Sequence, residues 1–134
     1  SLSVRTMRLL LDSHIFLWWV TDDRRLTSKA RRAIASDASD CLLSHASVWE
    51  MAMKASLGKL ELDRPVGRFI EDQCELNGFS LLAISFRHLV AVESLPWHHR
   101  DPFDRLLVAQ AMEDGFTLVT RDATLARYGI KTIG

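Results

Sequence analysis

The sequence predicts an α/β fold: a three-layer sandwich in which helices cover both faces of a mainly parallel sheet of four or five strands. Short β-rich runs alternate with helical stretches along the 134 residues. Strands separated by helices need crossover connections, and crossovers give parallel sheets that are covered on both faces. The sequence contains no repeat, low-complexity segment or linker, so one domain is expected over residues 7–134. The stretch "SLSVRT" (1–6) is interpreted as a leader or a cloning remnant outside the fold.

The first half of the chain contains two expected strands, each followed by a helical stretch. Apolar "MRLLL" (7–11) is typical of a buried strand, and a helix is expected at 13–20. A basic helix at 28–37 precedes the second strand, "CLLS" (41–44). The next expected helix, 46–56, is followed by a glycine, which is typical of a helix end.

The second half continues the alternation. Its first expected helix, 66–78, lies between a proline and a glycine, which are typical of a helix start and a helix end. The remaining expected elements are a strand at 79–84, a helix at 86–95, a helix at 102–114, a strand at 116–120, a short helix at 122–129 and a short strand at 130–133. This order predicts the fold class and leaves the order of strands in the sheet open.

Composition excludes several classes of protein. The 17 Lys and Arg residues balance the 17 Asp and Glu residues, so a polyanion would need a local basic patch, a metal ion or both. Apolar runs fall short of the ~20 residues of a membrane-spanning helix, and no secretory signal opens the sequence. Cys41 and Cys74 lack the number and spacing of a disulfide framework or zinc site, and are expected to be reduced thiols of a cytoplasmic protein.

Acidic residues follow the expected strands, where parallel sheets place their ligands. Asp12 follows the first strand, Glu50 lies early in the helix after the second, and Asp122 follows the strand at 116–120. Each also has a structural explanation. Asp12 and Asp122 stand where helix N-caps belong, and Glu50 has Lys54 four residues later, a helix pair worth roughly 0.2–0.5 kcal/mol.

The stretch "HHRDPFDRLLVAQA" (98–111) adds a fourth acid. Asp101 is expected to cap the helix and Pro102 to fill its first position, which leaves Asp104 on the face that should meet the sheet. A buried carboxylate needs a partner, because losing its hydration costs more than the helix dipole returns. That partner is either one of three arginines, Arg100, Arg105 or Arg121, or a Mg²⁺ or Mn²⁺ ion shared by several carboxylates.

Four segments together resemble the PIN-domain nucleases, and most closely the VapC-type toxins of bacterial toxin–antitoxin pairs. They are "LLLDSH", "SVWEMAMK", "HHRDPFDRLLVAQA" and "LVTRDATLARYG", and the similarity extends from Met7 to Gly134. The resemblance implies that Asp12, Glu50, Asp104 and Asp122 form the family's acidic cluster, which binds Mg²⁺ or Mn²⁺ and hydrolyses RNA. Asp122 corresponds to the least uniform of the four acids, and Ser13 and Thr120 match the small hydroxyl residues beside the first and last.

The resemblance also implies partners: a homodimer, a small antitoxin protein that fills the active-site groove, and tRNA or rRNA as substrate. A basic stretch (22–32) offers phosphate contacts, or is simply a solvated helix face: Arg24, Arg25, Lys29, Arg31 and Arg32. Trp18, Trp19 and Trp49 lie inside expected helices and are assigned to the core, whereas Trp97 lies in a polar loop and is a contact candidate. His98 and His99 are interpreted as loop structure or RNA contacts.

The main hypothesis is therefore a metal-dependent endoribonuclease. The alternative is a non-catalytic PIN-like module that binds a protein partner or RNA. A phosphoacceptor or phosphatase-like domain fits poorly, because "LDSH" lacks an Asp-x-Asp pair and Lys131 is badly placed. Neither a glycine-rich dinucleotide fingerprint nor a P-loop is present, which excludes the common nucleotide-binding enzymes.

Overall fold

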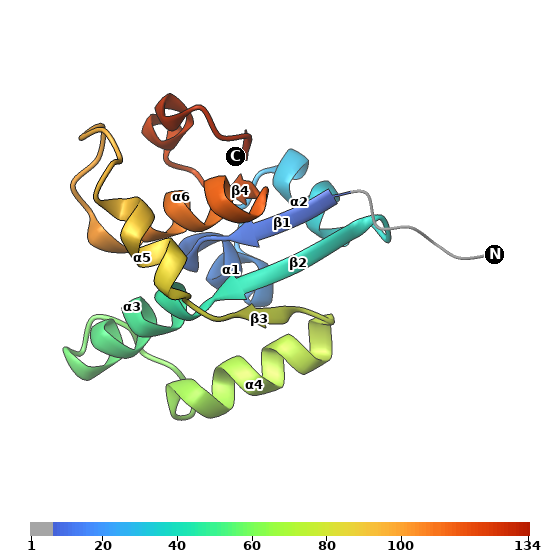
Figure 1. Ribbon diagram of the computed structural model, residues 1–134. Helices are drawn as coiled ribbons and strands as arrows, with labels where there is room; N and C mark the ends of the chain where they lie inside the picture. The colour runs from blue at the N-terminus through green and yellow to red at the C-terminus, as the bar shows by residue number, and fades with distance from the viewer. Residues whose placement is uncertain (1–6) are drawn as a thin grey trace.

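The computed structural model describes residues 7–134, and its centre is a five-stranded parallel sheet in the order β3-β2-β1-β4-β5 (Figure 1). The strands are β1 (Met7–Leu11), β2 (Ser39–Ser44), β3 (Ser80–Leu82), β4 (Thr117–Val119) and β5 (Thr132–Ile133). Every pairing between them is parallel, so the expected sheet is confirmed. The expected leader, residues 1–6, lies outside the described residues.

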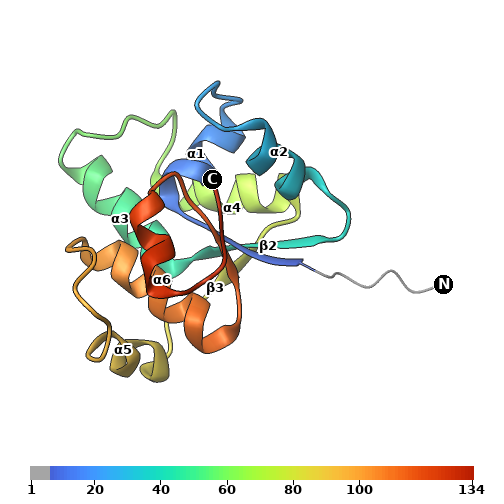
Figure 2. The same ribbon diagram turned by 90° about the horizontal axis from the view of Figure 1, so that it is seen from above.

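Helices cover both faces of the sheet, as the crossover connections require. They are α1 (Ser13–Val20), α2 (Ser28–Ala35), α3 (His45–Ser56), α4 (Val66–Asn77), α5 (Phe86–Val92), α6 (Pro102–Asp114) and the 3₁₀ helix η1 (Ala123–Tyr128). Figure 2 shows α1, α2 and α4 on one side of the strands and α5 and α6 on the other. Side chains of β1 alternate between the two faces of the sheet, as in any strand. Leu9 and Leu11 pack in the core on the side of α1 and α4, and Leu10 packs in the core on the side of α6.

Several elements are shorter than the sequence predicts. The helix expected at 28–37 ends at Ala35, because Ser36 has an extended backbone. The helix expected at 86–95 ends at Val92, and the one expected at 122–129 is the 3₁₀ helix η1. The strand expected at 116–120 contains only Thr117–Val119, and the N–H of Phe116 bonds instead to Ala111 in the last turn of α6. The strand expected at 79–84 contains only Ser80–Leu82.

The register of the sheet brings the ends of its central strands level. Leu11 lies opposite Leu43 of β2 and Val119 of β4, and the N–H of Asp12 donates to the carbonyl of Val119 at 3.1 Å. Residues that directly follow these strands therefore meet at one edge of the sheet. The helices among residues 7–134 lack the length and apolar character needed to cross a membrane.

Candidate active site

One cavity of about 450 Å³ at the carboxyl edge of the sheet is lined by all four acids that the sequence singles out. Asp12 caps α1, Glu50 lies in α3, Asp104 lies in the first turn of α6, and Asp122 caps η1. Asp101, the N-cap of α6, joins them as a fifth carboxylate. The fold thus gathers acids that are far apart in the sequence around one hollow.

Asp12 is both a helix cap and a cavity residue, so the two interpretations of it are compatible. Its Oδ1 accepts a hydrogen bond from the N–H of Ile15 at 2.8 Å. Burial raises the pKa of Asp12, and hydrogen bonds from the Thr120 hydroxyl and the Ile15 N–H oppose that rise. The hydroxyl of Thr120 therefore contacts two of the acids. It donates to the carboxylate of Asp12 and accepts a hydrogen bond from the backbone N–H of Asp122 at 3.1 Å.

Glu50 is held by two side chains. Its Oε1 accepts a hydrogen bond from the Ser13 hydroxyl at 2.6 Å, and its Oε2 lies 3.0 Å from the Lys54 ammonium. The carboxylate is buried, whereas Lys54 remains about one-third exposed. The predicted pair of Glu50 with Lys54 therefore exists. Ser13, the small hydroxyl residue after Asp12, lies in α1 and donates to Glu50 in α3.

Asp104 lies in an environment that disfavours its charge. Burial, together with the negative charges of Asp101, Asp12 and Glu50, raises the pKa of Asp104 to about 7, although His99 opposes the shift. Within residues 7–134 its carboxylate accepts no hydrogen bond, and the nearest positively ionisable group is Nε2 of His99, 3.5 Å from Oδ2. Several carboxylates converge on this position, and among the described residues Lys54, which pairs with Glu50, is not within ion-pair distance of Asp104.

The arginine explanation for Asp104 is wrong. Arg105 is buried and points away from the acids, where it donates to the Pro96 carbonyl at 2.9 Å and lies 3.7 Å from the centre of the Trp97 ring. Arg121 donates to the carbonyl of Arg25 at 3.0 Å. Across the described part of the chain, no arginine lies within ion-pair distance of Asp104.

His99 joins the site through Asp122, and the sequence interpretation missed it. Its Nδ1 accepts the backbone N–H of Asp101 at 3.1 Å, so Nε2 carries the proton and donates to Oδ2 of Asp122 at 2.7 Å. The other oxygen, Oδ1, accepts from the N–H and hydroxyl of Thr124 at 3.0 and 2.6 Å. Burial raises the pKa of Asp122, but these donors outweigh it and leave that pKa low.

The two adjacent histidines have different surroundings. The ring of His98 packs edge-on against Tyr128, with 4.9 Å between ring centres, whereas His99 faces the acids. Ligand atoms of His99, Asp104 and Asp122 lie within 4.8 Å of one another. The sequence carries no signal that separates His99 from His98, because only the fold places His99 beside Asp122.

The donor set fits a hard divalent cation. Mg²⁺ and Mn²⁺ prefer carboxylate oxygens, and a doubly charged ion would offset the crowding that raises the pKa of Asp104. His99 is poorly suited to be a ligand here, since one nitrogen accepts a hydrogen bond and the other donates one. Asp12, Glu50, Asp104 and Asp122 are the residues that could hold the ion.

The predicted basic stretch contributes one residue to this cavity. Arg25 lines it, but its guanidinium pairs with Asp23 at 2.8 Å. Arg31 pairs with Asp22 at 2.7 Å, and the other three arginine and lysine residues of the stretch do not line the cavity. Arg121, one of the three arginines that the sequence offers as partners for Asp104, also lines the cavity.

The four tryptophans have different roles. Trp18 lines the cavity, and the guanidinium carbons of Arg25 and Arg121 lie 5.1 and 5.2 Å from its ring centre. Trp19 is half-buried and donates to Oδ1 of Asn77 at 2.9 Å.

The core assignment of Trp49 is wrong: its side chain is 57% exposed, because it lies on the outer face of α3 beside Phe103. Trp97 is 76% exposed, as its polar loop predicted.

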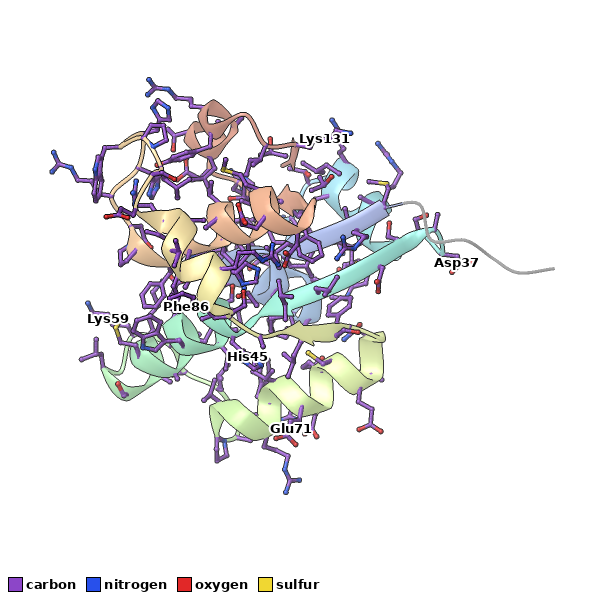
Figure 3. All side chains as sticks on the ribbon, viewed as in Figure 1. Asp37, His45, Lys59, Glu71, Phe86 and Lys131 are labelled. Atoms are coloured by element: carbon purple, nitrogen blue, oxygen red, sulfur yellow. The ribbon has the colours of Figure 1, made fainter. Side chains whose placement is uncertain are left out.

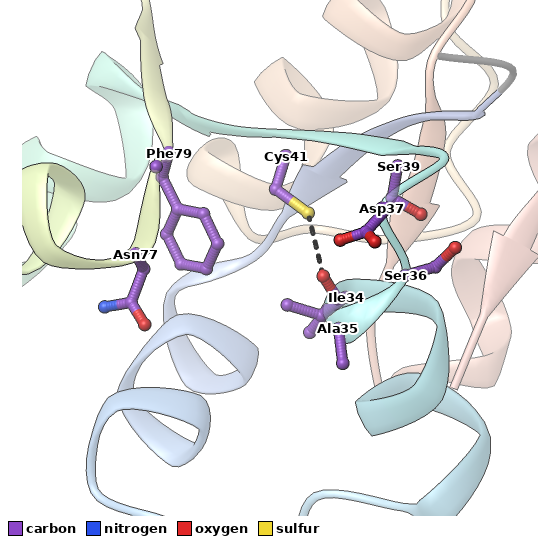
Figure 4. Close-up of a pocket in the computed structure, with 9 residues that line it drawn as sticks. Ile34, Ala35, Ser36, Asp37, Ser39, Cys41, Asn77 and Phe79 are labelled. Atoms are coloured by element: carbon purple, nitrogen blue, oxygen red, sulfur yellow. Dashed lines mark hydrogen bonds between the residues drawn. The ribbon is translucent and has the colours of Figure 1, made fainter. Parts of the chain in front are cut away.

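A second cavity, of about 470 Å³, opens near the start of β2, away from the acids (Figure 4). It is lined by Ile34, Ala35, Ser36, Asp37, Ser39, Cys41, Asn77, Gly78 and Phe79. Its thiol, Cys41, donates to the carbonyl of Ile34 at 3.9 Å, and Asp37 is its lone carboxylate. One isolated acid and a buried thiol do not form a reactive constellation, so the cavity lined by the acids is the candidate site.

Comparison with known proteins agrees with this geometry. The chain matches the PIN domain family over residues 9–131. It is 32% identical over 121 residues to Ribonuclease VapC22 of Mycobacterium tuberculosis, a similarity that covers 90% of this chain and 91% of that protein. The similarity between the two proteins therefore extends over nearly the whole of both chains.

Solved structures share the same fold. The VapBC2 complex of Rickettsia felis bound to a promoter DNA fragment contains a chain with a TM-score of 0.69 at 12% identity, covering 95% of this chain and 98% of that one. The VapBC-1 complex of nontypeable Haemophilus influenzae gives a TM-score of 0.64 at 12% identity, covering 95% and 97%. A toxin–antitoxin complex from Klebsiella pneumoniae gives 0.63 at 17% identity, covering 94% and 96%.

Proposed function

The chain belongs to the PIN domain family, and from this membership we propose that it is a metal-dependent endoribonuclease, the toxin of a toxin–antitoxin pair, which hydrolyses RNA phosphodiester bonds. One observation carries the proposal: Asp12, Glu50, Asp104 and Asp122 come from separate elements and line one cavity. The ribonuclease activity named for the M. tuberculosis relative supports the reaction class.

In this proposal the four acids bind Mg²⁺ or Mn²⁺. When bound, the ion would activate water and offset the charge that develops on phosphorus. The remaining residues orient the acids: Ser13 and Lys54 hold Glu50, and His99 and Thr124 hold Asp122. Because each of these groups bonds to a carboxylate, we assign them to positioning rather than to contact with RNA.

We also propose the partners. The similarity to chains solved in VapBC and toxin–antitoxin complexes supports a small antitoxin protein as the inhibitor. Apolar side chains exposed on α5, those of Phe86, Leu89 and Val90, support a homodimer. For the substrate we propose tRNA or rRNA. Cys41 and Cys74 are buried thiols rather than partners in a disulfide, which suits the reducing cytoplasm, where we place the protein.

The test is RNA cleavage by the toxin separated from its co-expressed antitoxin. Wild type, Asp12→Asn and Asp104→Asn are assayed on defined RNAs with Mg²⁺, Mn²⁺ or a chelator, and Mn²⁺ binding is measured by calorimetry. Asp37→Asn is the matched control, because Asp37 is exposed and lies at the other end of the sheet (Figure 3). We expect both site variants to lose cleavage and Mn²⁺ binding, and the control to retain them.

Undiminished cleavage by both site variants would reject the assignment. A wild-type protein that binds RNA or the antitoxin but never cleaves, and binds Mn²⁺ no better than the variants, would instead be a non-catalytic module. Thermal unfolding of each variant separates loss of the site from loss of the fold.

A further inference from the structure

The loop between α5 and α6 (93–101) contains His99 but has no helix or strand of its own. Its buried backbone N–H and C=O groups therefore need partners from other parts of the chain. For His99 these partners are side chains. Its N–H donates to the hydroxyl of Tyr128 at 3.0 Å, and its carbonyl accepts from a guanidinium nitrogen of Arg105 at 3.5 Å. The main chain of His99 is thus held from both sides.

The hydroxyl of Tyr128 connects the two groups that hold this loop. Its oxygen accepts from the His99 N–H and also from the Arg105 guanidinium, at 3.3 Å. Tyr128 is buried and belongs to the apolar core on the α6 side of the sheet. Because the ring is anchored in the core, its hydroxyl is a fixed point to which the loop is attached.

Tyr128 and Asp122 lie at opposite ends of the same short helix, η1. Asp122 is its N-cap and Tyr128 is its last residue. His99 contacts both, since its N–H donates to Tyr128 and its Nε2 donates to Oδ2 of Asp122 at 2.7 Å. The first contact fixes where the main chain of His99 lies. The second depends on the first, because the imidazole reaches Asp122 only from that position.

We propose that Tyr128 is a positioning residue of the metal site. Its hydroxyl holds the main chain of His99, and the imidazole in turn orients the carboxylate of Asp122 toward the ion. This inference rests on the proposed function and adds to it a residue outside the acid-lined cavity. Tyr128 does not line that cavity, so it acts through His99 and not by contact with the ion.

A purely structural role for the Tyr128 hydroxyl predicts a different result. A buried hydroxyl needs a partner whatever the site does, because an unsatisfied polar group in the core is costly. In that case removal of the hydroxyl lowers the melting temperature but leaves the orientation of His99 and the metal affinity unchanged. The two roles are therefore separated by measurements on the folded protein.

The test uses Tyr128→Phe, which removes the hydroxyl and keeps the ring. His98→Ala is the matched control, because the His98 ring packs on the Tyr128 ring and its removal leaves the hydroxyl in place. Both variants are studied well below their melting temperatures. NMR in chelator follows the Nε2–H of His99, which is assigned by its absence in His99→Ala. Calorimetry gives the affinity for Mn²⁺.

In the wild type, the bond to Asp122 should protect the Nε2–H of His99 from exchange with water. We expect Tyr128→Phe to lose this protection and His98→Ala to keep it. Mn²⁺ affinity should fall about three- to tenfold in Tyr128→Phe, the range that one neutral hydrogen bond supplies, and should not change in His98→Ala. In a His99→Ala background, Tyr128→Phe should cause no further fall, because the imidazole through which it acts is absent.

Three results would overturn the inference. The Nε2–H of His99 could stay protected in folded Tyr128→Phe. Tyr128→Phe and His98→Ala could have equal effects, which assigns the effect to packing of the ring. The losses caused by Tyr128→Phe and His99→Ala could add in the double variant, which means that Tyr128 acts by another route.

Failure of the proposed function would look different from failure of this inference. The wild type would then neither bind Mn²⁺ nor cleave RNA. The NMR measurement in chelator needs no metal, so it would still show whether Tyr128 holds His99 against Asp122.

Discussion

The imidazole of His99 and the carboxylate of Asp122 are joined by a hydrogen bond of 2.7 Å between Nε2 and Oδ2. The direction of this bond follows from the backbone, because the N–H of Asp101 already donates to Nδ1. One loop residue therefore connects the cap of α6 to the acid that caps η1. Thr124 holds the second oxygen, so the orientation of Asp122 depends on groups from two segments.

His99→Ala should therefore weaken Mn²⁺ binding by about 10–100-fold, the usual cost of removing a group that orients a metal ligand. Calorimetry with Mn²⁺ measures the effect. His98→Ala is the control, because His98 packs on Tyr128 and not on an acid. Equal Mn²⁺ affinity in wild type and His99→Ala would show that Asp122 needs no positioning, or that it is not a ligand.

Asp104→Asn should stabilise the protein when metal is absent. Since the folded-state pKa of Asp104 is raised to about 7, its neutral form favours folding fully below pH 3.8, and this contribution is lost as pH rises through about 7. At about pH 8 the variant should gain about 1–3 kcal/mol, since one pKa unit corresponds to ~1.4 kcal/mol and solvent screens part of the shift.

Thermal unfolding in chelator and in Mn²⁺ checks this expectation. Mn²⁺ should raise the melting temperature of the wild type, because a ligand of the folded state stabilises it, and should leave Asp104→Asn nearly unchanged. A variant that melts below the wild type in chelator would mean that the Asp104 charge is already compensated within the protein.

Ser13→Ala should weaken both the fold and the site. It removes the donor 2.6 Å from Oε1 of Glu50 and leaves a buried carboxylate oxygen short of a partner, at a cost of about 1–3 kcal/mol. Denaturant unfolding measures the loss, and Mn²⁺ titration shows whether the freed Glu50 binds the ion less well. Ser56→Ala is the matched control, because its hydroxyl donates to a helix carbonyl on an exposed turn. Equal losses in the two variants would contradict the role assigned to Ser13.

Asp114→Asn should affect stability alone. Burial raises the pKa of Asp114, but hydrogen bonds from Arg87 and His88, both 2.7 Å long, outweigh it and lower that pKa. The stability it contributes is therefore present above pH 3.8 and is lost as pH falls through the lower folded-state pKa. We expect a loss of about 1–3 kcal/mol at neutral pH, as for hydrogen bonds to charged groups.

The control for this variant is its metal affinity, which should equal that of the wild type because Asp114 lies at the far end of α6 from Asp104. A measurable fall in Mn²⁺ binding by fully folded Asp114→Asn would mean that the two ends of the helix are coupled.

The fold class and the meeting of the four acids at one edge of the sheet could be predicted, because both follow from local sequence patterns. Apolar runs mark the strands, and a parallel sheet places Asp12 and Asp122 at the same edge once the strands are recognised. His99 and Trp49 could not be predicted in this way. The contact of His99 with Asp122 joins residues 23 positions apart, and the exposure of Trp49 depends on how α3 packs against α6. Both depend on tertiary packing, which propensity does not specify.

Arg105 fixes the loop that carries His99, although it follows Asp104 directly in the chain. Its buried guanidinium donates to the carbonyls of Val92, Leu95, Pro96 and His99 and to the Tyr128 hydroxyl. Lysine, with three donors on a single nitrogen, cannot serve so many acceptors at once. A genetic selection for harmless mutants of this protein would therefore recover Arg105 substitutions beside those of the acids. Growth phenotypes alone would not separate the acids from Arg105, whose guanidinium bonds to backbone carbonyls and the Tyr128 hydroxyl.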